Sequence, residues 1–111
     1  MSFNIEYSHH FKKSAKTLSK KYPSFKNDLY KLIDDLAENP ILGTSLGNNL
    51  FKVRMSIQNK GRGKSGGARV ITCVLYKDEK ILLADIYDKG DYSTVDEKQI
   101  IKILTSEGFN L

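Results

Sequence analysis

The spacing of apolar residues changes along the chain, and each change predicts a new element of secondary structure. Apolar and polar residues alternate from Phe3 to Tyr7, which predicts a short strand. Between residues 11 and 22 the apolar side chains recur every three or four positions, the spacing of one helix face. Tyr22 and Pro23 interrupt that pattern, and a second apolar stripe over residues 25–36 predicts a second helix before Asn39 and Pro40. We expect the two helices to form a hairpin.

Strand-like segments dominate the middle of the chain. Residues 50–57, 68–76 and 80–88 are rich in β-branched and aromatic residues, and the short turn KDEK joins the last two. They predict an antiparallel meander. The Gly- and Asn-rich residues 41–49 predict a loop that leads into it, and a long glycine-rich stretch over residues 58–67 connects its first two strands.

A third helix is predicted to close the chain. Thr94 stands three residues before Glu97, the spacing of a capping box, and an apolar stripe follows before Gly108. With 111 residues the chain has the size of one domain, so we expect residues 1–111 to share a single core.

Composition excludes several classes of protein. The chain is 40% hydrophobic and 28% charged, which argues against disorder and fibrous repeats. No apolar run approaches the roughly 20 residues that cross a bilayer, and the N-terminus lacks a secretory signal, so we expect the cytoplasm and no membrane partner. The one cysteine, Cys73, lies in an apolar run, where a thiol acts as a small hydrophobic group.

Positive charge is concentrated in one part of the chain. Lys and Arg number 18 against 13 Asp and Glu, and no acidic residue lies between Glu38 and Asp78. Such a block favours a polyanionic partner, although a solubilising surface would have the same composition. The same two interpretations apply to the lysines of the first predicted helix, Lys12, Lys13, Lys16, Lys20 and Lys21. The cations of the acid-free block are Lys52, Arg54, Lys60, Arg62, Lys64, Arg69 and Lys77.

The glycine-rich stretch contains GRGKSG, residues 61–66, which fits the glycine spacing of a dinucleotide site and includes the Gly-Lys-Ser of a phosphate loop. A dinucleotide site needs a helix after the glycines, whereas the β-branched residues 70–72 predict a strand. A phosphate loop would need glycine where Gln58 stands. We therefore expect no nucleotide cofactor, and cations alternating with glycines favour contact with phosphates instead.

Histidine and cysteine suggest no further site. His9 and His10 lie at the start of the first predicted helix, far in sequence from the basic strands, and we interpret them as surface or capping residues. Two adjacent histidines and one buried cysteine lack the ligand spacing of a zinc site. We expect no metal.

The order of these parts carries a resemblance. Two helices, then FKVRMS, KGRGKSGGARV and ADIYDKGDYST, then an amphipathic helix, resemble the RelE/ParE toxin superfamily, particularly HigB-type and related RelE toxins. The resemblance implies an α+β fold with an N-terminal helical hairpin packed on a small, mainly antiparallel twisted sheet, followed by a C-terminal helix. It also implies an endoribonuclease that enters the ribosomal A site, beside 16S rRNA, cuts mRNA without metal or cofactor, and is held inactive by a cognate antitoxin.

Several residues match the family pattern. Lys52 and Arg54 match an alternating basic pair, Arg69 matches the arginine that opens the next strand, and Tyr87 with Lys89 match a tyrosine and lysine near the end of the third meander strand. The resemblance makes these five the catalytic candidates. The cations that match the basic loop of HigB-like relatives, and so become RNA-binding candidates, are Lys60, Arg62 and Lys64.

The match also has departures. Gly90 stands where RelE has an arginine, and Asp96 stands near the place of a later tyrosine, for which Tyr92 is the available substitute. The general acid and base therefore stay unassigned.

Cleavage without a metal requires the 2′-hydroxyl to attack the adjacent phosphate. Arg54 and Arg69 suit the phosphate because guanidinium offers a fork of donors with permanent charge. Lys52 or Lys89 could act as the base if neighbouring cations favour its neutral form. Tyr87 could stack on a base or donate a proton, or it could be an ordinary sheet aromatic. Two other functions remain open, a ParE-like non-enzymatic inhibitor of DNA gyrase and a plain RNA-binding module.

Overall fold

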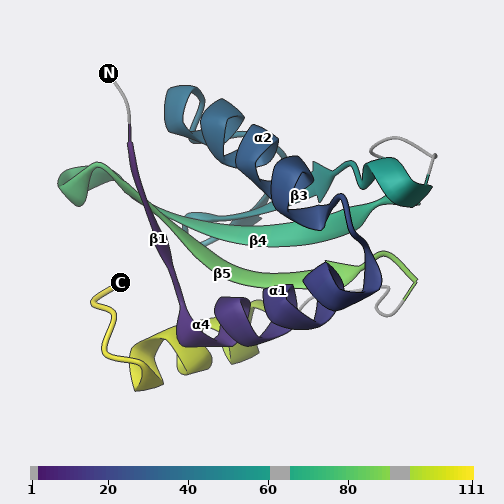
Figure 1. Ribbon diagram of the computed structural model, residues 1–111. Coiled ribbons are helices and arrows are strands. Elements are labelled where there is room, and N and C mark those ends of the chain that lie inside the picture. The colour runs from purple at the N-terminus through teal and green to yellow at the C-terminus, as the bar shows by residue number, and fades with distance from the viewer. Residues whose placement is uncertain (1–2, 61–65, 91–95) are drawn as a thin grey trace.

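The computed structural model describes residues 3–60, 66–90 and 96–111 (Figure 1). Its strands form one five-stranded sheet in the order β1-β5-β4-β3-β2, in which β1 runs parallel to β5 and every other neighbouring pair is antiparallel. The predicted α+β class and the meander β3-β4-β5 are confirmed. The elements are β1 (Asn4–Tyr7), α1 (His9–Lys21), α2 (Phe25–Glu38), β2 (Thr44–Gly47), β3 (Leu50–Met55), η1 (Gln58–Lys60), β4 (Ala68–Leu75), η2 (Tyr76–Asp78), β5 (Lys80–Asp88) and α4 (Glu97–Ser106).

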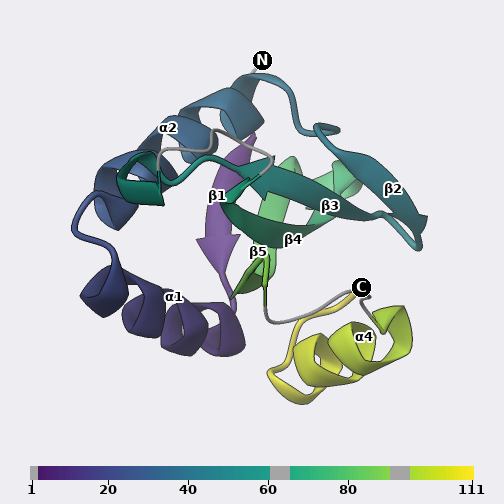
Figure 2. The same ribbon diagram turned by 90° about the vertical axis from the view of Figure 1, so that its right-hand side faces the viewer.

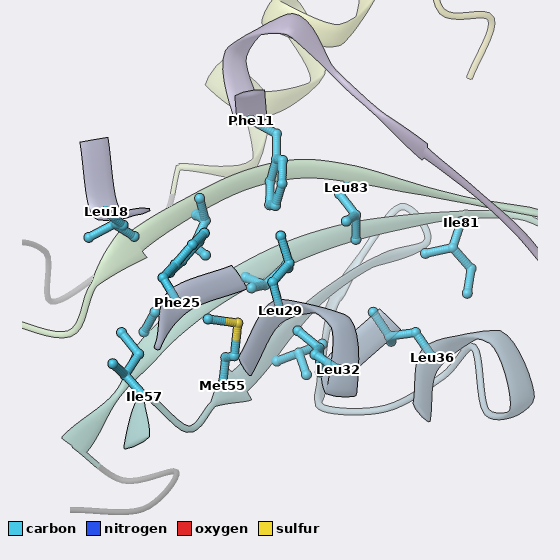
Figure 3. Close-up of a cluster of buried hydrophobic side chains, with 14 residues drawn as sticks. Phe11, Leu18, Phe25, Leu29, Leu32, Leu36, Met55, Ile57, Ile81 and Leu83 are labelled. Carbon is cyan, nitrogen blue, oxygen red and sulfur yellow. The ribbon is translucent and has the colours of Figure 1, made fainter. Parts of the chain in front are cut away.

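The helices cover opposite faces of the sheet. Figure 2 shows α1 and α2 on one side of the strands and α4 on the other. Figure 3 shows apolar side chains of the hairpin, including Phe11, Phe25 and Leu29, directed toward Met55 and Leu83 of the sheet. We call the buried residues of this face the hairpin cluster. It comprises Phe11, Leu18, Phe25, Leu29, Leu32, Leu36, Val53, Met55, Ile57, Ala68, Val70, Ile81, Leu83 and Ile86. A second set, the α4 cluster, lies on the other face. It comprises Leu50, Ile71, Cys73, Leu82, Ala84, Tyr87, Ile100 and Leu104.

Ser8 fixes where α1 begins. Its hydroxyl accepts a hydrogen bond from the N–H of Phe11 at 2.9 Å, which satisfies a donor of the first helical turn. The same hydroxyl donates to the carbonyl of Ala84 on β5 at 2.9 Å, and the Ser8 N–H donates to the carbonyl of Leu83 at 3.0 Å. A single buried residue therefore ends β1, caps α1 and attaches the helix to β5.

The loop predicted over residues 41–49 is wrong in part, because it contains strand β2. Gly47 pairs with Leu50, so Asn48 and Asn49 alone form the turn between β2 and β3. Both asparagines have positive φ, 54° and 62°, as a two-residue hairpin turn requires. Gly and Asn are frequent in turns, and that composition concealed a strand which exists only through its pairing with β3.

The predicted start of the last helix is also wrong. α4 begins at Glu97, and Asp96 is its N-cap, because the Asp96 carboxylate accepts from the N–H groups of Lys98 and Gln99 at 3.0 and 3.3 Å. Thr94, the predicted cap, lies outside the described residues. The Asp96 side chain supplies acceptor and negative charge together, which suits a helix N-terminus better than a hydroxyl.

The expected burial of Cys73 is confirmed. Its side chain is 2% exposed, and burial raises the pKa of the thiol. No helix within the described residues is long and apolar enough to cross a membrane.

Candidate functional site

A row of side chains crosses three neighbouring strands on one face of the sheet. Arg54 on β3 stands directly opposite Arg69 on β4, which stands directly opposite Tyr87 on β5. Their apolar neighbours, such as Val53 and Val70, belong to the hairpin cluster. Because successive residues of a strand point to opposite faces, Arg54, Arg69 and Tyr87 lie on the α4 side. We call these three residues the basic row.

Lys52 extends the positive charge of the basic row along β3. It lies two residues before Arg54 and opposite Ile71, which belongs to the α4 cluster, so Lys52 shares their face. Arg54 is exposed, and Lys52 and Arg69 are half-buried. Three cations on one face concentrate positive charge there.

Tyr87 is the aromatic end of the basic row. It is 7% exposed, and burial raises the pKa of its phenol above the ordinary value. The neighbouring charges act in opposite directions, since Arg69 lowers this pKa and Asp85 raises it. Tyr87 therefore holds its proton near neutral pH, in the state that can donate it.

Lys89 lies just beyond the end of β5 and is exposed. Its backbone N–H donates to the carbonyl of Gly67 at 3.2 Å, which holds the end of β5 beside the start of β4. Gly67 in turn lies so close to β3 that an added Cβ would stand 1.9 Å from the carbonyl oxygen of Met55. Glycine is required here because the backbones approach too closely for a side chain. Arg62 and Lys64 lie outside the described residues.

Lys60 is directed to the other face of the sheet. Its ammonium lies 2.6 Å from Oδ1 of Asp88, and the Tyr22 hydroxyl donates to Oδ2 of Asp88 at 2.7 Å. The Lys21 ammonium lies 3.5 Å from the same Oδ2, and the ammonium groups of Lys21 and Lys60 stand 5.3 and 5.5 Å from the centre of the Tyr22 ring. Asp88 alternates with Tyr87 along β5, so this cluster lies on the hairpin side, apart from the basic row.

Asp88 is the strongest electrostatic feature of that cluster. Its side chain is buried, and burial alone would raise the pKa of the carboxyl. Hydrogen bonds from Lys60 and Tyr22 and the charge of Lys60 outweigh burial and lower the pKa to about 2. Asp88 is therefore ionised at neutral pH and joins the end of α1 to the residues that precede the glycine-rich loop.

The start of that loop is also attached to the helical hairpin. The buried Asp28 of α2 accepts from the Ser24 hydroxyl at 2.7 Å and from the N–H of Gln58 at 3.0 Å. The N–H of Ser24 donates to the Asn59 side chain at 2.5 Å. These contacts attach η1 to the start of α2.

A groove of about 450 Å³ lies between α2 and the edge of the sheet. Lys52 and Arg54 border it, together with Asp28, Lys31 and Asp35, whereas Arg69 and Tyr87 do not line it. Of the basic row, Arg54 therefore borders this groove, and the groove does not bring the three residues together. Within residues 3–60, 66–90 and 96–111, no three His, Cys, Asp or Glu side chains are placed to hold a metal ion.

Sequence reasoning missed one pair of titratable residues beside the basic row. Nε2 of His10 lies 3.1 Å from Oδ1 of Asp85, two residues before Tyr87 on β5. The two partners are 75 positions apart, and neither stands in a recognisable motif. No local sequence signal joins them, because only the packing of α1 on β5 brings them together.

Comparisons with known proteins give a consistent picture of the fold. No family model matches the chain, and no curated protein sequence matches it. Solved structures do match. An arginine-to-alanine double mutant of the E. coli toxin RelE in the free state has a TM-score of 0.62 at 12% identity, over 98% of this chain and 100% of that chain. The isolated E. coli RelE toxin has a TM-score of 0.62 at 14% identity, over 93% of this chain and 100% of that one.

A toxin–antitoxin complex is also similar. RelBE2 from Mycobacterium tuberculosis matches at a TM-score of 0.62 and 13% identity, over 80% of this chain and 100% of the matched chain. Identities this low demonstrate likeness of fold and do not transfer an activity. The helical hairpin, the five-stranded sheet and the C-terminal helix together give this chain a RelE-like fold.

Proposed function

We propose that the protein is the toxin of a type II toxin–antitoxin pair and that it cleaves mRNA on the ribosome without a metal, thereby stopping translation. The observation that carries the proposal is the basic row, in which two permanently charged arginines and a protonated tyrosine follow one another across β3, β4 and β5. The likeness to RelE toxin structures supports the toxin assignment.

The proposed reaction is attack of the ribose 2′-oxygen on the neighbouring phosphorus. The P–O5′ bond breaks, and the products carry a 2′,3′-cyclic phosphate and a 5′-hydroxyl. Arg54 and Arg69 bind the phosphoryl oxygens and stabilise the charge that develops on them, with Lys52 adding to the positive field. Tyr87 protonates the departing 5′-oxygen.

The remaining cations bind the RNA outside the reacting phosphate. We assign Arg62 and Lys64 to backbone phosphates, because cations that alternate with glycines favour contact with phosphates. Lys60 belongs to the same set by its position in sequence, and it contacts RNA only after leaving Asp88. Lys89, exposed just beyond β5, stays a catalytic candidate that adds positive charge near the reacting phosphate. The mRNA in the A site and the adjacent 16S rRNA are the proposed nucleic-acid partners.

A cognate antitoxin is the proposed protein partner. The similar M. tuberculosis structure is a toxin–antitoxin complex, which supports this assignment. An antitoxin would hold the toxin inactive in the cytoplasm until the antitoxin is degraded.

Primer extension after brief induction in bacteria tests the proposal. The wild type should produce mRNA breaks at codon-related positions, and Arg69→Ala should abolish them. Lys77→Ala removes an exposed cation of η2, on the far end of β4 from Arg69, and should cleave like the wild type. Intact transcripts alongside broken DNA would instead support inhibition of gyrase.

A further inference from the structure

A β-bulge next to the basic row changes the direction of one side chain. Ile71 pairs with Asp85 while the next residue, Thr72, pairs with Leu83, so β5 contains one extra residue, Ala84. Bulges are frequent beside functional sites because they redirect the residues that follow them. Here the bulge is held in place by Ser8, whose N–H and hydroxyl bind the carbonyls of Leu83 and Ala84. The first turn of α1 therefore lies directly beside Asp85.

The Asp85 carboxylate contacts the imidazole of His10. Oδ1 of Asp85 lies 3.1 Å from Nε2 of His10 and also accepts from the N–H of Ile86 at 2.8 Å. The His10 side chain is 38% exposed and that of Asp85 is 18% exposed, so the imidazole is both oriented and accessible. The neighbouring His9 makes no side-chain hydrogen bond or ion pair with any described residue, which makes it a natural control.

Asp85 lies on the same sheet face as the basic row, and His10 contacts it from the first turn of α1. Asp85 stands two residues before Tyr87 on β5. It pairs with Ile71 on β4, which in turn pairs with Lys52 on β3. The charge of Asp85 is felt by Tyr87, whose pKa it raises. A histidine bound to Asp85 is thus placed at the α1 end of the cationic face.

Other charged groups around His10 come from α4 and β5. The Glu107 carboxylate accepts from the backbone N–H of His9 at 2.6 Å and of His10 at 3.0 Å. These bonds engage the backbone and leave the imidazole ring free to interact with Asp85. Burial raises the pKa of Asp85, whereas His10 and the Ile86 N–H lower it.

We propose that His10, oriented by Asp85, accepts the proton of the 2′-hydroxyl in the proposed cleavage reaction. The inference rests on the proposed function and supplies the base that the family resemblance left unassigned. The 2′-oxygen loses its proton to Nδ1 of His10 and forms the bond to phosphorus, while the P–O5′ bond breaks and the 5′-oxygen takes a proton from Tyr87. Exchange with solvent then returns one proton to Tyr87 and removes one from His10.

The chemistry favours histidine over the lysines of the same face. An ordinary lysine is almost wholly protonated at neutral pH and has no lone pair to accept a proton, whereas imidazole is largely neutral there. When Nε2–H donates to Asp85, the lone pair of Nδ1 is left as the acceptor, the role that a carboxylate partner gives to histidine in hydrolytic triads. Asp85 is accordingly a positioning residue.

The pH dependence of single-turnover cleavage tests this role. Purified toxin variants are mixed with bacterial ribosomes carrying a defined mRNA, and rates are measured from about pH 5.5 to 8.5. The wild-type rate should rise with pH and then level off, as expected for a reaction whose base must be deprotonated. His10→Gln can still donate a hydrogen bond to Asp85 but cannot take up a proton, so it should lose that rise and about 10²- to 10⁴-fold in rate.

Two further variants complete the test. Asp85→Asn keeps an acceptor for His10 without the charge and should lower the rate at least about tenfold while keeping the histidine-dependent rise. His9→Gln should behave as the wild type. A His10→Gln protein that keeps both the wild-type rate and its pH profile overturns the inference.

The controls separate this failure from failure of the proposed function. A wild-type protein that cuts no mRNA, with or without ribosomes, refutes the nuclease itself. A wild-type protein that cuts, with Arg69→Ala inactive and His10→Gln unaffected, refutes only the role of His10. If circular dichroism shows that His10→Gln is unfolded, Asp85→Asn becomes the deciding variant. An unchanged cleavage rate in Asp85→Asn then overturns the inference.

Discussion

Arg54 and Arg69 stand directly opposite each other on β3 and β4, although both side chains are permanently positive. Facing like charges lower the stability of a sheet by a few tenths of a kcal/mol to about 1 kcal/mol. The pair concentrates positive charge on one face, which supports the proposed phosphate-binding surface.

Replacing Arg54 with alanine should separate function from stability. Arg54 is exposed, so its loss relieves repulsion and should leave the free energy of unfolding unchanged or raised by up to about 1 kcal/mol. Cleavage should fall by about 10²- to 10³-fold, as expected when one donor to a developing oxyanion is lost. Urea unfolding and the ribosome cleavage assay measure the two effects, with Lys77→Ala as the control. Lost activity in an unfolded variant would contradict the prediction.

Asp88 should make the free energy of unfolding depend on pH. Its pKa of about 2 in the folded protein, against an ordinary 3.8, corresponds to about 2 kcal/mol of stability. Because the folded pKa is the lower one, this contribution is complete above about pH 5 and is lost as pH falls through 3.8 toward 2. Asp88→Asn should therefore be less stable than the wild type at pH 7, and the difference should shrink by pH 3.

Urea unfolding at pH 7 and pH 3 measures this difference. Asp34→Asn, on the exposed side of α2, is the matched carboxyl-to-amide control and should show little change at either pH. A difference between Asp88→Asn and the wild type that is as large at pH 3 as at pH 7 would show that the ion-pair cluster contributes little.

Gly67→Ala tests the close approach of β3 to the start of β4. The added Cβ would meet the Met55 carbonyl at 1.9 Å, and both partners are backbone, so the strands must move apart. We expect the free energy of unfolding to fall by about 1–3 kcal/mol or more. Gly90→Ala is the control, because a Cβ there meets nothing within 4 Å. Equal melting temperatures for the two variants would contradict the structure at this position.

Glu107 should stabilise the chain by joining its two ends. Its carboxylate accepts from the free N–H groups of His9 and His10, where the helix dipole of α1 also favours negative charge. Glu107→Ala should lower the free energy of unfolding by about 0.5–2 kcal/mol, the usual cost of a lost cap. Glu38→Ala, at the exposed C-terminal end of α2, should cost less. Thermal unfolding of the two variants compares them directly.

The elements that sequence reasoning located are those that carry their own periodicity. The β-branched and aromatic residues of β3, β4 and β5 predicted the strands, and the two-residue repeat of a strand places Lys52 and Arg54 on one face. The three-to-four residue spacing predicted α1 and α2 in the same way. Strand β2 was missed because the Gly and Asn residues in and beside it are typical of loops, and its pairing with β3 is not visible in the sequence.

The amino-acid sequence by itself determined the helices, the meander strands, the excess of positive charge and the shared face of Lys52 and Arg54, since each depends on neighbours in the chain. Only the tertiary structure showed that β1 runs parallel to β5, that Lys60 forms an ion pair with Asp88, and that His10 contacts Asp85. These contacts join residues far apart in sequence. Their partners are selected by burial and by the register of neighbouring strands, which no local pattern of residues specifies.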